Sequence, residues 1–194
     1  MRKNLEIIEL DVLVANYIRA EATRGSGSLG RMAQAASRDA KIIRETFQTI
    51  AFAPAIQELM GRKLFVTKPE QCEFPDYQIL VDGEDTHYEV ENLRIPNHLL
   101  ANGGITNQVE LSRWVFLKKP PNKIRPNTIL AVYGDFTAQA FDLSVFAEEI
   151  AKLYSGHRAD IWFYAKADPL EQRWVVHRVN PPPELSHFYY PFGR

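Results

Sequence analysis

Two short stretches of alternating side chains, joined by a tight-turn signal, constrain the fold of this chain more than any other feature. The stretches cover residues 77–81 and 87–91, and Asp82-Gly83 between them is a dipeptide typical of two-residue hairpin turns. We therefore expect two neighbouring antiparallel strands. Because the apolar side chains of such a strand pair must be buried, the sheet that contains the two strands should pack against helices.

Further helices and strands are predicted on both sides of this hairpin. Apolar spacing near 3.6 residues predicts helices over residues 5–22, 37–60, 108–118 and 142–153. Short apolar runs predict strands over residues 63–66, 128–133, 159–165 and 173–179. Pro54 is expected to break or restart the second helix, and Gly61 to end it. This order of elements predicts an α/β fold with a mixed central sheet flanked by helices.

The chain of 194 residues is long enough for one domain with a buried core. We expect an N-terminal helical arm (1–24), a flexible linker or loop (25–31), an α/β domain (32–180) and a tail rich in proline and aromatic residues (181–194). The N-terminal helix packs on the domain or, alternatively, on a second subunit in a homodimer. The tail is expected to run over the surface as extended chain, with a proline-rich partner ligand as the alternative.

The linker also fits the dinucleotide-binding pattern G-x-G-x-x-G between Gly25 and Gly30. That pattern binds phosphate when a strand precedes it, whereas a helical pattern precedes it here. The linker interpretation is therefore favoured over a nucleotide-binding loop.

The composition excludes several classes of protein. Apolar residues make up 45% and charged residues 24%, which is globular usage and not that of a disordered or membrane chain. Cys72 is the single cysteine, so an internal disulfide is excluded and a zinc site would have too few thiolates. Acidic residues interrupt the N-terminal apolar run before it could serve as an export signal. We expect a cytoplasmic protein with no membrane partner.

The side chains suited to chemistry lie on the predicted hairpin. Because side chains alternate along a strand, Glu89 and Glu91 share one face. Asp76 lies just before the first strand, so strand pairing would bring it close to them. Three carboxylates this close repel one another unless a cation balances them, and carboxylates with a carbonyl such as that of Val90 suit Mg²⁺ or Mn²⁺. A solvated acidic face is the alternative.

The motif Phe74-Pro75-Asp76, followed by Glu89-Val90-Glu91, resembles the PD-(D/E)XK signature of the restriction-endonuclease-like nucleases. The core of that family is a helix, three strands, a helix and a further strand, which the order predicted over roughly residues 37–165 matches. The resemblance implies a restriction-endonuclease-like core in which Asp76 and Glu89 bind the metal. It also implies that Glu45, on the helix before the sheet, adds an acidic residue, and that the protein is a metal-dependent endonuclease acting on DNA.

Glu91 stands where this family usually has a lysine, which orients the attacking water and stabilises developing charge. Glu91 would then complete the metal shell or act as a general base. In some members the lysine has moved to a neighbouring element, and here Gln108, Lys118 or Lys119, on or just after the following helix, could reach the site. A catalytically inactive domain of the same fold, binding nucleic acid or protein, is the alternative.

A cationic segment follows the predicted site. The net charge is −1, so attraction to nucleic acid must come from a local basic face. Between Ser112 and Gly134 the sequence has no acidic residue. We expect DNA phosphates to be contacted from this segment, with a solvated loop as the alternative. The basic side chains are Arg113, Lys118, Lys119, Lys123 and Arg125.

Overall fold

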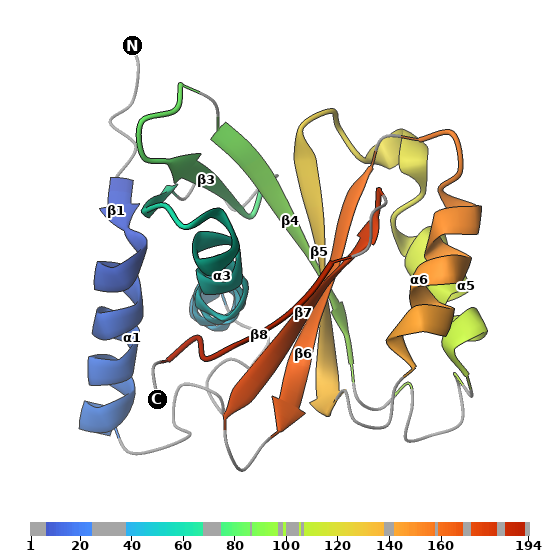
Figure 1. Cartoon of the computed structure of the whole chain (residues 1–194). Coiled ribbons are helices and arrows are strands. Elements are labelled where there is room, and N and C mark those ends of the chain that lie inside the picture. The colour runs from blue at the N-terminus through green and yellow to red at the C-terminus, as the bar shows by residue number, and fades with distance from the viewer. Residues whose placement is uncertain are drawn as a thin grey trace. The chain divides into compact units, whose positions relative to one another are not determined.

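The computed structural model describes residues 7–24, 38–67, 75–85, 87–96, 99, 105, 107–137, 142–157, 159–168, 172–181 and 185–192. Within these ranges the chain forms eight strands and four α-helices, which confirms the mixed α/β class (Figure 1). It divides into two compact units, Met1–His87 with Tyr190–Arg194, and Tyr88–Tyr189.

The first unit contains three antiparallel strands and two helices. Strand β2 (Leu64–Thr67) lies between β1 (Ile7–Glu9) and β3 (Tyr77–Val81), and pairs antiparallel with both. Helices α1 (Leu10–Arg24) and α3 (Arg38–Met60) belong to the same unit. The strands contribute alternate side chains to the interior, while α3 is buried over its central turns. The fully or almost fully buried residues include Leu10, Ile50, Phe52, Leu64 and Ile79.

Two features of this unit differ from the sequence predictions. Residues 7–9 form a strand, not the first turn of a helix, because Ile7 and Ile8 pair with Thr67 and Val66 of β2. Three residues are too few for a period of 2 to be told from a period of 3.6. Helix α3 also continues through Pro54, where Ala53 and Ala55 on either side are fully buried.

Packing of this buried segment therefore outweighs the hydrogen bond that proline removes. The predicted end of the helix is confirmed, since Gly61 adopts a positive φ of 61° and its N–H donates to the carbonyl of Gln57 at 3.0 Å.

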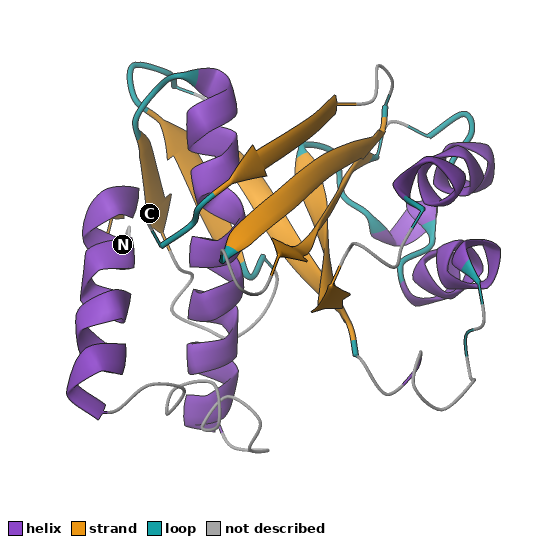
Figure 2. Ribbon diagram, turned by 60° about the horizontal axis from the view of Figure 1, so that its bottom comes forward, coloured by secondary structure: helices purple, strands orange, loops and turns teal. Residues whose placement is uncertain are grey.

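The second unit contains five strands, which pair in both parallel and antiparallel directions. Strand β4 (His87–Ile95) pairs parallel with β5 (Thr128–Thr137), and β5 pairs parallel with β6 (Asp160–Asp168). Strands β7 (Arg173–Asn180) and β8 (Leu185–Tyr189) continue the sheet antiparallel. Helices α5 (Gln108–Lys118) and α6 (Leu143–Leu153) form the two crossovers and lie side by side (Figures 1 and 2).

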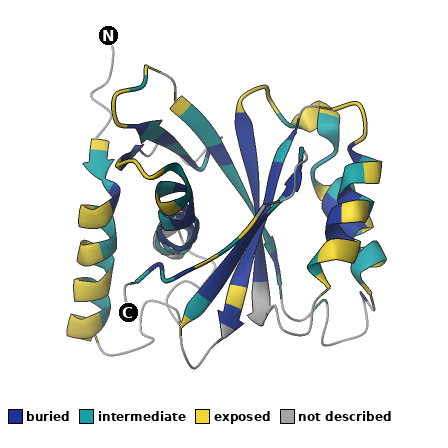
Figure 3. Cartoon of the chain, in the orientation of Figure 1, coloured by how far each residue is buried: buried dark blue, intermediate teal, exposed yellow. Residues whose placement is uncertain are grey.

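The start of each crossover helix follows the sequence signal. Asn107 caps α5 by accepting from the N–H of Glu110, and the Asp142 carboxylate caps α6 by accepting from Ser144 and Val145. Both helices pack on one face of the sheet, where strands β5 to β7 are largely buried (Figure 3). The core there includes Leu130, Val132, Phe163, Leu111, Val115, Phe146 and Ile150.

The chain beyond β7 is more ordered than the sequence suggested. Residues 185–189 form β8, in which Tyr189 lies opposite Trp174 and is almost fully buried. Burial of aromatic side chains against β7 favours strand pairing over loose extended chain. The linker expected at residues 25–31 lies outside the described residues. No helix among the described residues has both the length and the apolarity needed to cross a bilayer.

Candidate functional site

Strand β4 positions the two glutamates of the sequence motif. Glu89 and Glu91 alternate with Val90, which is fully buried on the opposite face. Leu93 and Ile95, two and four residues beyond Glu91, pack into the core formed with α5 and α6. Because the period of a strand is 2, both glutamates point to the face of the sheet that these helices cover.

Glu91 forms an ion pair with Lys119, the residue directly after α5. The side chain of Glu91 is 13% exposed and that of Lys119 is 26% exposed, so solvent screens this pair only in part. The crossover geometry explains the contact. The chain runs from β4 through α5 into the parallel strand β5, so the last turn of α5 lies near the start of β5 and the β4 residues paired with it. Of the three residues on or just after this helix that the sequence analysis expected could reach the site, Lys119 is the one that contacts Glu91.

The backbone of Lys119 is fixed from two sides. Its N–H donates to the carbonyl of Val115 at 2.9 Å, which closes the last turn of α5. Its carbonyl accepts from the hydroxyl of Tyr154 at 2.5 Å, at the end of α6. Tyr154 is fully buried, with its ring edge-on to Phe116. This burial raises the pKa of the Tyr154 phenol well above its usual value, so the hydroxyl remains a donor at neutral pH.

Glu89 lies beside the first residue of β5. Glu89 and Thr128 are register partners in the parallel pair, and the Thr128 hydroxyl lies 3.5 Å from a Glu89 carboxylate oxygen. The N–H of Glu89 donates to the carbonyl of Asn127 at 3.3 Å. A neutral hydroxyl therefore neighbours the Glu89 carboxylate, in contrast to the cation beside Glu91.

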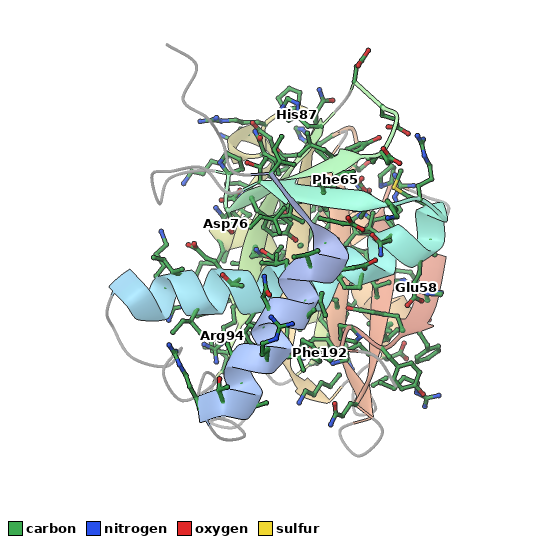
Figure 4. All side chains as sticks on the ribbon, turned by 90° about the vertical axis from the view of Figure 1, so that its left-hand side faces the viewer. Glu58, Phe65, Asp76, His87, Arg94 and Phe192 are labelled. Carbon is green, nitrogen blue, oxygen red and sulfur yellow. The ribbon has the colours of Figure 1, made fainter. Side chains whose placement is uncertain are left out.

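The other predicted acidic residues belong to the first unit. Asp76, labelled in Figure 4, directly precedes β3 and is half-buried. Glu45 is buried on α3 and its carboxylate lies 3.4 Å from the ammonium of Lys41. Because these residues and the β4 glutamates lie in different units, their convergence stays a prediction. Among the described residues, no group of three or more His, Cys, Asp or Glu side chains could hold a metal ion.

The basic residues differ in how they are placed. Arg113 and Lys118 are exposed on α5, and the Lys118 ammonium lies 5.8 Å from the ring centre of Trp114. Lys123 is exposed in a short 3₁₀ helix (Pro121–Lys123), and Arg125 is exposed just beyond it. Lys119 instead turns toward Glu91. Gln108, the first residue of α5, lies a full helix length from Lys119 along the chain.

Two residues near Glu89 and Glu91 were not predicted from the sequence. If a parallel pairing of β4 and β5 through a crossover helix had been assumed, the register of that pair would have placed Thr128 beside Glu89. Tyr154 had no comparable signal, because its partner is a backbone carbonyl 35 positions away and an apolar helix end predicts only core packing. In comparisons with known proteins, no family model, curated protein or solved structure matches the chain.

Proposed function

We propose that this protein is a metal-dependent endonuclease-like hydrolase acting on the phosphodiester bonds of DNA. The observation that carries the proposal is the ion pair between Lys119 and Glu91, next to Glu89 on the same face of β4. A lysine at the end of the neighbouring crossover helix thus contacts Glu91, which occupies the strand position where restriction-endonuclease-like nucleases usually carry a lysine. The resemblance of the motif at Asp76, Glu89 and Val90 supports the same conclusion.

The chain order adds support. A helix, α3, is followed by β2, β3 and β4, then by a crossover helix and a parallel strand, α5 and β5. This is the order of elements that the resemblance implies, within a fold class that matches. A restriction-endonuclease-like core remains part of the proposal.

The donor set of the proposed site suits a hard divalent cation. Carboxylates of Asp76 and Glu89 and the backbone carbonyl of Val90 would hold Mg²⁺ or Mn²⁺, which prefer oxygen ligands. When bound, such an ion supplies Lewis acidity toward a phosphoryl oxygen and lowers the pKa of a bound water. Glu91 is less available as a ligand because Lys119 neutralises it.

In this proposal Lys119 is a positioning and charge-stabilising residue. Its ammonium is held by Glu91 and its backbone by Val115 and Tyr154, so the cation is fixed before substrate arrives. A preorganised cation stabilises the charge that develops on phosphate oxygens without further reorganisation. The exposed Arg113, Lys118, Lys123 and Arg125 would contact the DNA backbone.

The test is cleavage of supercoiled plasmid DNA by purified protein in Mn²⁺ or Mg²⁺. We expect nicking that stops when EDTA removes the metal, and at least about a 100-fold lower rate for the double variant Asp76→Ala, Glu89→Ala. Glu148→Ala, an exposed acidic residue on α6, is the matched control and should retain the wild-type rate.

Equal residual cleavage by the wild type and the double variant would identify a contaminating nuclease and contradict the proposal. In that case, salt-dependent retention of DNA by both proteins would favour a catalytically inactive domain of the same fold that binds nucleic acid. Loss of DNA retention by Arg113→Glu with Lys118→Glu would then locate the binding surface on α5.

A further inference from the structure

The two glutamates on one face of β4 differ in what holds their carboxylates. The Glu91 carboxylate pairs with the ammonium of Lys119. Among the described residues no cation lies within ion-pair distance of Glu89, and its oxygen Oε2 lies 3.5 Å from the hydroxyl of Thr128 instead. A hydroxyl can donate a hydrogen bond to a carboxylate without adding a positive charge beside it. One oxygen of Glu89 is therefore held by a neutral donor, while Oε1 has no hydrogen-bond donor in the described part of the chain.

Thr128 can hold this oxygen because its own side chain is fixed. It is the first residue of β5 and is only 3% exposed. Glu89 is its register partner in the parallel pair of β4 and β5, which run side by side in Figure 1, so the two side chains lie next to each other on one face. A buried hydroxyl needs a hydrogen-bond partner, and a β-branched side chain has few rotamers in which to find one. The Glu89 carboxylate is that partner.

The turn that precedes β5 holds the backbones of both residues. Asn127 adopts a positive φ of 62°, a left-handed conformation that asparagine tolerates better than most residues. Its carbonyl accepts from the N–H of Glu89 at 3.3 Å, and the N–H of Thr128 donates to the carbonyl of Arg125 at 3.3 Å. The hydrogen bond between the two side chains therefore starts from a fixed main chain at each end.

We propose that Thr128 is a positioning residue for Glu89, whose Oε2 accepts from the Thr128 hydroxyl and whose Oε1 is left to bind the divalent cation. The inference rests on the proposed function, in which Glu89 is a metal ligand. A donor on the second oxygen of a ligating carboxylate fixes its orientation before the metal arrives. A lysine in the same place would compete with the metal for the carboxylate, as Lys119 does at Glu91.

Two substitutions at Thr128 separate the hydroxyl from the rest of the side chain. Thr128→Val keeps the branching at Cβ and removes the hydroxyl, whereas Thr128→Ser keeps the hydroxyl and removes a buried methyl group. Ser112→Ala is the matched control, because it also removes a buried hydroxyl of the same unit. The Ser112 hydroxyl contacts only main-chain oxygens, those of Gln108 at 2.9 Å and Phe146 at 3.3 Å.

The test is a titration with Mn²⁺ alone, without DNA, in which the EPR signal of the free ion gives the dissociation constant. We expect this constant to rise about tenfold in Thr128→Val and to stay within about twofold of the wild type in Thr128→Ser and Ser112→Ala. If Thr128 acts through Glu89, adding Thr128→Val to Glu89→Ala should weaken Mn²⁺ binding no further. Circular dichroism checks that each variant is folded, and Thr128→Ala replaces Thr128→Val if the latter is not.

The outcomes separate this inference from the nuclease proposal. If Thr128→Val binds Mn²⁺ as tightly as the wild type while Glu89→Ala does not, Thr128 has no positioning role and Glu89 is still a metal ligand. An equal loss of affinity in Thr128→Val and Thr128→Ser would also overturn the inference, because the hydroxyl would not be the cause. If the wild type does not bind Mn²⁺, or if Glu89→Ala leaves the affinity unchanged, both proposals are wrong.

Discussion

The two units each contain a lysine–glutamate pair that joins segments distant in sequence, and the two pairs differ in their surroundings. In the second unit, Lys119 and Glu91 are 26% and 13% exposed. In the first unit, the ammonium of Lys63 lies 3.0 Å from the carboxylate of Glu9, and these side chains are 62% and 33% exposed. The partners are chemically identical. Exposure to water therefore decides what each pair contributes to stability and function.

The backbone support of the two pairs differs as well. The main chain of Lys119 is held through Val115 and Tyr154, so its side chain starts from a fixed point. Lys63 directly precedes β2 and has an exposed side chain that loses rotamer freedom when it contacts Glu9. A preorganised, partly desolvated charge is what a catalytic site needs, whereas a screened surface charge contributes little.

The largest expected effect comes from removing the lysine of the more buried pair. Lys119→Met leaves the Glu91 carboxylate poorly solvated and without its cation, so we expect a loss of about 1–3 kcal/mol in the free energy of unfolding. Urea denaturation followed by circular dichroism measures it. If the loss comes from the uncompensated carboxylate, adding Glu91→Gln should recover most of it. A loss below the error of the measurement would remove the contrast between the two pairs.

A smaller effect is expected from the hydroxyl that holds Lys119. Tyr154→Phe keeps the ring against Phe116 but removes the hydrogen bond to the Lys119 carbonyl, at a cost of about 0.5–1.5 kcal/mol. If the role of Tyr154 is purely structural, this loss of stability is the only effect expected. If Tyr154 positions the lysine, the coupling energy between Lys119 and Glu91, measured by a double-mutant cycle, should also fall in the Tyr154→Phe background. An unchanged coupling energy would show that the ion pair forms without this support.

The sequence predicted the parts of the molecule that depend on local pattern. Residues 77–81 and 108–118 form β3 and α5 with the predicted bounds, because alternation, capping and apolar spacing agree there. Strand β8 and the unbroken α3 were missed because both depend on burial against distant residues, which outweighs the local effect of proline in α3.

The same distinction applies to the candidate site. Strand alternation was enough to place Glu89 and Glu91 on one face, and the length of the following helix was enough to bring Lys119 within reach. The contact of Tyr154 with the Lys119 carbonyl depends on how α5 and α6 pack together, and no local pattern encodes it. The predicted approach of Asp76 to these residues depends on how the two strands on either side of Asp82-Gly83 pair.

The smallest expected effect comes from the exposed pair, where Lys63→Met should change the stability by no more than the error of a urea titration. The Lys63 side chain is largely solvated and Glu9 is partly exposed, so salt screens their attraction and water replaces the lost contact. The hydrogen bond to Glu9 is the main cause that raises the pKa of Lys63 above its usual value. A raised lysine pKa stabilises the fold fully at pH values below the unfolded-state pKa, and this contribution is lost as the pH rises through the folded-state pKa. Any difference in stability between wild type and Lys63→Met should therefore be present at neutral pH and low salt. It should vanish in strongly alkaline buffer, and also in 1 M salt, where the Debye screening length is about 3 Å. A difference that persists in high salt would mean that Lys63 acts through packing of its aliphatic stem, and the contrast with Lys119 would then rest on contact area and not on solvation.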